Sequence, residues 1–182
     1  MNKQFLANEN LYLRAVEPED LSFLYNIEND PNLWDVSNIT VPYSKFVLRQ
    51  YIEASQSDIF SDRQLRLMIV RREDNELLGT LDITEFHPLH GRGQVGIAIK
   101  KEFRQQGYAS QALKLLCDYT FQFLQFRQLY AYIAANNGPS IQLFKSLGFK
   151  KAALLKDWLM IEGEYQDTYI YQLINKDQLS ND

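Results

Sequence analysis

Residues 94–116, QVGIAIKKEFRQQGYASQALKLL, most constrain the fold, because they predict a strand, a turn and a helix without a gap. Val95, Ile97 and Ile99 alternate with small or polar residues, which is the period of a strand with one buried face. From Ala109 onward the apolar residues recur at helical spacing. A helix that begins directly after such a turn directs its unpaired N–H groups and positive dipole end at the turn. The segment therefore favours an anion, most naturally a phosphate, at the start of the helix.

The turn itself has one glycine, Gly107, which lets the backbone approach an anion without a Cβ in the way. It is not a nucleotide P-loop, because Lys100 and Lys101 precede the turn and no lysine follows Gly107 as GxxxxGK[ST] requires. The dinucleotide fingerprint GxGxxG is also absent. An ordinary strand-to-helix turn with exposed basic residues is the alternative that this segment alone leaves open.

Length and composition narrow the class of protein. With 182 residues, 46% of them hydrophobic and 23% charged, the chain predicts one globular domain over 1–182. A net charge of −4 argues against a nucleic-acid surface as a partner. No apolar run is long enough to cross a bilayer, so we expect no membrane partner. The single Cys117 falls in the periodic segment and predicts a core thiol, which fits the reducing cytoplasm.

The remaining elements follow from the same periodicities. Alternation predicts strands at about 11–15, 65–70, 77–86, 129–134, 154–160 and 165–174, and helical spacing predicts helices at about 18–28, 44–52 and 140–147. Residues 33–43 show no period and predict a loop. Gly79 marks a bulge or a close approach, and Gly148 suits the left-handed position after a helix. This order predicts an α/β (α+β) fold with a mixed sheet of about six to seven strands and helices on both faces, with a ligand at the carboxyl end of the central strand.

Three separated segments resemble the GNAT superfamily of N-acetyltransferases. Arg104, Gly107 and Ala109 fill the pattern Q/R-x-x-G-x-G/A of its acyl-CoA signature. The segment from Asn137 to Phe149 looks like the element N-x6-Y/F-x3-GF, and the opening Leu13-Arg14-Ala15 looks like the LRP-x5-DL start. Within the superfamily the chain is most similar to spermidine and diamine N-acetyltransferases and to enzymes that acetylate ribosomal-protein N-termini.

The resemblance implies that acetyl-CoA is the co-substrate and binds in a V between the strands at 95–99 and 129–134. The pantetheine arm would pair with the backbone of Ile97, Ala98 and Ile99 like an added strand. The implied pyrophosphate-binding residues are Arg104, Gln105, Gln106, Gly107, Tyr108, Ala109 and Ser110. Asn137 would hydrogen-bond the arm and Lys145 would reach a phosphate, although Lys145 equally suits a solvated helix face.

Transfer needs a polarising N–H group, a base for the amine proton and a means of stabilising the leaving thiolate. The backbone N–H of Ile97 or Ala98 is the candidate polarising donor. Many relatives have a tyrosine where this chain has Phe144, and many have a glutamate where it has Gln94. Tyr130, Tyr132 or Tyr108 would then protonate the sulfur, with Tyr132 retained as a catalytic candidate, unless solvent does so. The candidate bases are Asp82 and Glu85, which alternation places on opposite faces of their strand.

A polyamine acceptor would need carboxylates along its channel, because a multiply charged cation otherwise keeps its hydration in water. The candidate residues are Glu28, Asp35 and Glu162 besides Asp82 and Glu85, with Trp34 as a cation-π wall or, alternatively, a buried anchor of its loop. Two histidines without a nearby cysteine predict no metal site. The alternatives are an N-terminal protein acetyltransferase, an aminoglycoside-type enzyme or a catalytically weak CoA-binding module. Self-association into a homo-oligomer stays open.

Overall fold

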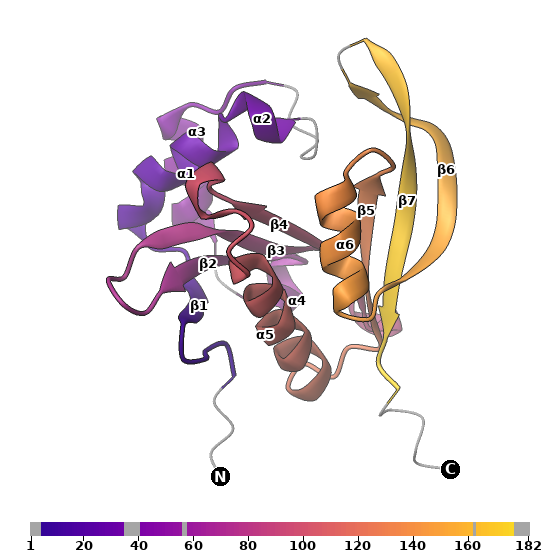
Figure 1. Cartoon of the computed structure of the whole chain (residues 1–182). Helices are drawn as coiled ribbons and strands as arrows, with labels where there is room; N and C mark the ends of the chain where they lie inside the picture. The colour runs from indigo at the N-terminus through magenta and orange to yellow at the C-terminus, as the bar shows by residue number, and fades with distance from the viewer. Residues whose placement is uncertain (1–4, 35–40, 56–57, 162, 177–182) are drawn as a thin grey trace.

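A mixed sheet runs through the middle of the computed structural model, which describes residues 5–34, 41–55, 58–161 and 163–176 (Figure 1). The strands lie in the order β1-β2-β3-β4-β5-β7-β6. Their bounds are β1 Leu11–Ala15, β2 Leu65–Arg71, β3 Leu77–His87, β4 Arg92–Ile99, β5 Gln128–Ala134, β6 Lys150–Ile161 and β7 Glu164–Ile174. Neighbouring strands are antiparallel except β4 and β5, which are parallel. The expected mixed sheet is confirmed.

Helices join these strands and cover the sheet. They are α1 Leu21–Glu28, α2 Pro31–Trp34, α3 Lys45–Ala54, α4 Ile59–Asp62, α5 Tyr108–Gln122 and α6 Gly138–Ser146, with short 3-10 helices at Pro18–Asp20, Pro88–His90 and Lys101–Phe103. The parallel step from β4 to β5 runs through α5, as a crossover between parallel strands requires. The strand, turn and helix expected over 94–116 are therefore present.

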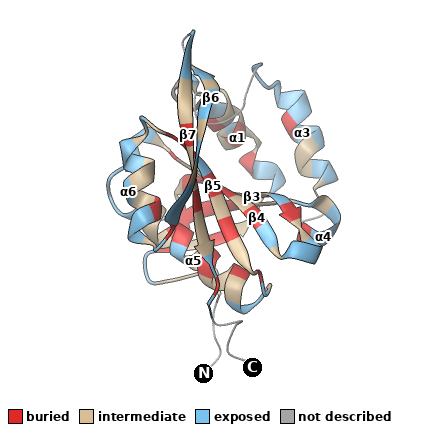
Figure 2. Cartoon of the chain, turned by 90° about the vertical axis from the view of Figure 1, so that its right-hand side faces the viewer, coloured by how far each residue is buried: buried red, intermediate tan, exposed pale blue. Residues whose placement is uncertain are grey.

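Strand β2 shows that helices cover both faces of the sheet. Leu67 and Ile69 belong to the larger core cluster, which includes side chains of α5 and α6. Met68 and Val70 belong to a second cluster with side chains of α1 and α3. Since successive side chains of a strand point to opposite faces, the sheet separates these two cores. Figure 2 shows the buried residues gathered in the central strands and on the sides of the helices that face them.

The structure differs from the sequence prediction mainly in short or irregular elements. The predicted loop over 33–43 is wrong at its start, because Pro31 begins the four-residue helix α2. Helix α4, capped by the Asp58 side chain, is too short to show a period. Strand β6 begins at Lys150 instead of at 154, and two register shifts against β7 obscure its alternation.

Two glycine predictions are confirmed. At Gly79 a Cβ atom would lie 2.0 Å from the carbonyl oxygen of Ala98, so glycine allows the close approach of β3 and β4. Gly148 has a φ of +88° and donates its N–H to the carbonyl oxygen of Lys145, which closes α6. Both positions fix where β4 and α6 lie beside the central opening described below.

Cys117 lies in the larger core cluster, as predicted for a core thiol. Burial raises the pKa of its thiol to about 12, so the thiol is neutral and poorly nucleophilic at neutral pH. Among the helices of the described segments, none has the length and apolar character needed to span a bilayer.

Arg14 and Asp20 join the first strand to the first helical segment. The Asp20 carboxylate accepts hydrogen bonds of 2.7 and 2.8 Å from the Arg14 guanidinium and one of 2.8 Å from the Glu17 backbone N–H. Burial opposes ionisation of Asp20, which is only 2% exposed, but the bonds from Arg14 and Glu17 outweigh burial and lower its pKa.

We expect Asp20→Asn to lower the free energy of unfolding by about 1.5–3 kcal/mol at pH 7, the usual range for a hydrogen bond to a charged group. Because the pKa of folded Asp20 is below the ordinary aspartate value of 3.8, the stabilisation is complete above that pH and declines as pH falls. Urea unfolding between pH 7 and pH 3 measures the difference. The exposed neighbour Glu19 provides the control Glu19→Gln. An equal loss in both variants would contradict the assignment.

Candidate active site

The central opening lies between the parallel strands β4 and β5. They pair over three residue pairs, from Arg92–Gln128 to Gln94–Tyr130. Beyond this point β4 stays in register with β3 as far as Ile99, while β5 stays in register with β7. The strands therefore separate after Gln94 and Tyr130, and in the described part of the chain the facing edge of β4 has no strand partner from Val95 onward. This is the V-shaped opening that the sequence resemblance implies.

The predicted pantetheine-binding residues Ile97, Ala98 and Ile99 lie on this separated part of β4. Their edge presents backbone N–H and C=O groups to the opening, which suits an extended amide-containing arm. The separated stretch of five residues, 95–99, is about 16 Å long at the usual rise of a strand. A ligand that is held at the carboxyl end of β4 can therefore extend back along it to the point where the strands meet.

At the carboxyl end of β4 the chain forms the glycine turn and enters α5. Gln105 and Gly107 have left-handed φ angles of +60° and +80°. No side chain caps the start of α5, so its first N–H groups face outward with the positive end of the helix dipole. Arg104 donates its Nε hydrogen to the carbonyl oxygen of Ile99 at 2.9 Å, which ties the turn to the strand.

The predicted phosphate-binding residues thus form one continuous turn. Arg104, Gln105, Gln106 and Gly107 are exposed, and Tyr108, Ala109 and Ser110 form the half-buried first turn of α5. Outward N–H groups beside an exposed guanidinium are the chemistry that a diphosphate requires. The roles of the individual residues stay predictions.

Asn137 precedes α6 as its cap, and Lys145 lies in the last turn of that helix. The Asn137 side-chain oxygen accepts the Ser140 N–H at 3.1 Å and caps this helix. Its oxygen therefore has a structural partner, and the predicted bond to the cofactor arm would use the amide NH2 group. Lys145 is exposed in the last turn of α6, which fits both the phosphate contact and a solvated helix face.

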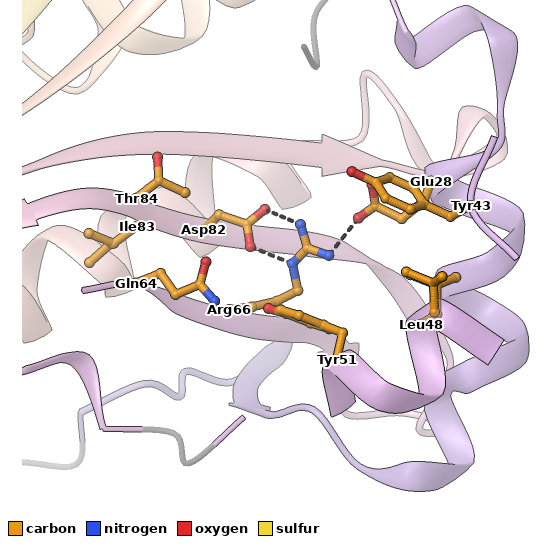
Figure 3. A pocket seen from close by; sticks show the side chains of 10 residues that line it. Glu28, Tyr43, Leu48, Tyr51, Gln64, Arg66, Asp82, Ile83 and Thr84 are labelled. Atoms are coloured by element: carbon orange, nitrogen blue, oxygen red, sulfur yellow. Dashed lines mark hydrogen bonds and ion pairs between the residues drawn. The ribbon is translucent and has the colours of Figure 1, made fainter. Parts of the chain in front are cut away.

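Over β2 and β3, on the sheet face covered by α1 and α3, lies a cavity of about 260 Å³. Figure 3 shows Arg66 at its centre between two carboxylates. Arg66 donates Nε to Asp82 at 2.6 Å and Nη1 to Glu28 at 2.5 Å. Burial disfavours the charged guanidinium, but the charges of Asp82 and Glu28 outweigh burial and raise the pKa of Arg66 further. Tyr43 and Tyr51 are among the other lining residues.

Asp82 and Glu28, predicted as base and substrate ligand, are therefore brought together by an arginine that sequence reasoning missed. Arg66 lies directly across from Asp82 in the register of β2 and β3. Pairing the two predicted strands in this register would have suggested the ion pair. The contribution of Glu28, from α1, could not be found in this way, because it depends on how the helix packs over the sheet.

Glu85 lies on the same sheet face as Asp82, so the prediction of opposite faces is wrong. Its carboxylate accepts the Tyr130 hydroxyl at 2.9 Å, and Tyr130 shares its face with Gln94 and Thr84 through the strand register. A register shift between Thr84 and His87 and the left-handed φ of +50° at Glu85 interrupt the alternation of β3.

Tyr132 and Phe144 differ in exposure and in contacts. Tyr132 is exposed and stacks on Trp158 of β6, with ring centroids 6.3 Å apart. Phe144 is 3% exposed and packs against Phe149 in the core. Phe144 therefore serves packing and offers no proton.

Several predictions fall outside the described part of the chain. Asp35 and Glu162 are not among the described residues, and the same holds for the side chain of Trp34 at the end of α2. In the part that is described, no three His, Cys, Asp or Glu side chains form a group that could hold a metal ion.

Comparison with known proteins agrees with this architecture. The model of the acetyltransferase (GNAT) domain family matches residues 10–150. The uncharacterized N-acetyltransferase p20 of Bacillus licheniformis is 30% identical over 172 residues, 94% of this chain and 97% of the relative. Spermidine N(1)-acetyltransferase of Vibrio cholerae is 28% identical over 168 residues, 91% of this chain and 95% of the relative. The solved structure of the Vibrio cholerae spermidine N-acetyltransferase with CoA and spermine superposes with a TM-score of 0.83 at 25% identity, covering 95% of this chain and 100% of that one.

The chain therefore belongs to the GNAT acetyltransferase family. It is an acyltransferase that takes the acetyl group from acetyl-CoA and transfers it to an amine. The separated edge of β4 and the uncapped start of α5 fit this donor, because one suits its extended amide arm and the other its diphosphate.

We expect Gly107→Glu to weaken CoA binding at least about tenfold in isothermal titration, which corresponds to about 1.4 kcal/mol. A carboxylate at the helix start repels phosphate, and a side chain at a φ of +80° adds left-handed strain. Gly163→Glu is the matched control, because Gly163 has a φ of +85° at the distant β6–β7 turn and open space around it. Equal CoA affinity in all three proteins would contradict the site.

Proposed function

We propose that this enzyme acetylates a primary amine of a diamine or polyamine such as spermidine. The observation that carries the proposal is the cavity over β2 and β3, where Glu28 and Asp82 meet one guanidinium. Two carboxylates and one arginine leave one net negative charge. A cationic amine compensates this charge, whereas a neutral or acidic acceptor does not.

The position of the cavity suits an acceptor that approaches the thioester. Asp82 and Thr84 line the cavity, and in the register of β3 and β4 they lie opposite Gly96 and Gln94. Gln94 is the last residue of β4 that pairs with β5. The cavity therefore lies over β3, the direct neighbour of the strand along which the acetyl end of the donor would lie.

The lining also suits the hydrocarbon part of a polyamine. Tyr43, Tyr51 and Leu48 present ring and aliphatic surface next to the ion pairs. Alternating charge and apolar surface is what a chain of methylene groups between amines would contact. The Vibrio cholerae relatives, whose names or structures specify spermidine and spermine, support the same acceptor class.

For the chemical step we propose the following groups. The N–H of Ile97 or Ala98 polarises the thioester carbonyl. Asp82 or Glu85 accepts the amine proton, and Tyr132, which is exposed on the β5 side of the opening, acts on the leaving thiolate. Phosphate contacts by Arg104 and Lys145 and further substrate contacts by Trp34, Asp35 and Glu162 belong to the same proposal. Self-association and a cytoplasmic location stay predictions, which light scattering and cell fractionation would check.

An amine panel tests the acceptor. We expect release of CoA with spermidine and diamines and much less with aminoglycosides or peptides that carry a free N-terminus. Glu28→Gln removes the net negative charge of the cavity, so we expect the KM for spermidine to rise about tenfold and the KM for acetyl-CoA to stay unchanged. The matched control is Glu53→Gln, an exposed position on α3. Acetylation of peptides alone would rule out the polyamine acceptor.

A further inference from the structure

Two of the positions from which the amine proton could be accepted, Gln94 and Asp82, are poorly suited to the task. Gln94 is an amide, which is not basic. Asp82 already accepts two hydrogen bonds from Arg66, at 2.6 and 3.3 Å, and protonating it would leave a half-buried guanidinium with one carboxylate less.

Glu85 is placed differently from these residues. It is exposed and forms no ion pair within 4.0 Å among the described residues. Its φ of +50° is unfavourable for a glutamate, and it occurs where the β3–β4 register shifts between Thr84 and His87. Regular alternation would point the side chain at position 85 into the core, so this conformation brings the carboxylate to the sheet face that carries Asp82 and the cavity. Functional sites are among the places where backbone strain of this kind clusters.

Tyr130 fixes the orientation of this carboxylate. Its hydroxyl donates to Glu85 Oε2 at 2.9 Å, across strand β4, which lies between β3 and β5. Tyr130 itself is held by its strand and by an edge-on contact with Tyr132, with ring centroids 5.8 Å apart. Burial, the bond to Glu85 and the charge of Glu85 raise the pKa of Tyr130, whereas Arg92 lowers it, so the phenol keeps its proton.

The Glu85–Tyr130 pair also lies at the end of the opening where β4 and β5 are still joined. Tyr130 and Gln94 are the last residues at which β5 and β4 are joined, and the strands separate directly beyond them. A donor held at the glycine turn extends along β4 toward this junction, because the turn is at the other end of the separated stretch. The acetyl group and the attacking amine would therefore meet beside the Glu85–Tyr130 pair.

We propose that Glu85 is the group that accepts the proton of the attacking amine, and that Tyr130 is the positioning residue that orients its carboxylate. This inference rests on amine acetylation by the family, and deepens the proposed function without depending on spermidine as the acceptor. The amine nitrogen forms the new C–N bond to the thioester carbon, and the C–S bond breaks as its electron pair leaves with sulfur. One proton moves from nitrogen to Glu85, which later releases it to solvent, and the thiolate takes up one proton from Tyr132 or solvent, so the products are the acetylated amine and CoA with no net change in protons.

Steady-state kinetics with acetyl-CoA and spermidine test the proposal on the full chain. If the wild type does not turn over spermidine, the best amine of the panel is used, so failure of the polyamine acceptor is recognised separately. We expect Glu85→Gln to lower kcat at least about a hundredfold, the usual effect of losing a general base, with KM for acetyl-CoA within about threefold. Glu85→Asp keeps a carboxylate and tolerates a left-handed φ, so its kcat should be at least about ten times that of Glu85→Gln.

The role of Tyr130 is tested by a double-mutant cycle. We expect Tyr130→Phe to lower kcat about tenfold, and the double variant with Glu85→Gln to be no slower than Glu85→Gln alone, because Tyr130 acts through the carboxylate. Tyr165→Phe, at an exposed position of β7, is the matched control with wild-type kcat. Melting temperatures of all variants show whether a loss of rate is a loss of folding, and Glu85→Gly, which relieves the left-handed strain, should lose kcat while keeping or raising the melting temperature.

Two results would overturn the inference. If Glu85→Gln keeps kcat within about threefold of the wild type, another group accepts the proton. If the effects of Tyr130→Phe and Glu85→Gln multiply in the double variant, Tyr130 acts independently and does not position Glu85.

Discussion

The separation of β4 and β5 is the constraint on which the rest of the molecule depends. Two parallel strands that start side by side would normally continue to pair, since unpaired backbone groups are costly when buried. Here each strand is held on its outer side instead, β4 by β3 and β5 by the antiparallel strand β7. The β6–β7 hairpin, which forms that end of the sheet, therefore helps to keep the opening in place (Figure 1).

The two faces of the sheet carry different parts of the candidate site. The face under α5 and α6 carries the larger core and positions the glycine turn. The opposite face is covered by α1 and α3, which bury Met68 and Val70 of β2. The same face carries the polar residues Arg66, Asp82 and Tyr130. The turn that fits the donor's diphosphate thus lies at one end of β4, and the cavity proposed for the acceptor lies on the face opposite α5 and α6.

Arg66 explains why the cavity can hold two carboxylates without leaving both of them unpaired. Glu28 comes from a helix and Asp82 from a strand, and both are held by the same guanidinium. Two like charges so near one another are tolerated because the cation lies between them. The arrangement fixes the wall of the cavity, while the Glu85 carboxylate is held by a neutral phenol instead.

The sequence by itself determined the strand, turn and helix over 94–116, the family and the donor, because these depend on local periodicity and on a motif read along the chain. It also indicated the close approach at Gly79 and the end of α6 at Gly148, where backbone geometry demands glycine. Only the tertiary structure decided which charges meet. Alternation placed Glu85 on the wrong face because a bulge shifts the register by local geometry that periodicity does not report, and the contacts of Arg66 with Glu28 and of Tyr130 with Glu85 join residues 38 and 45 positions apart.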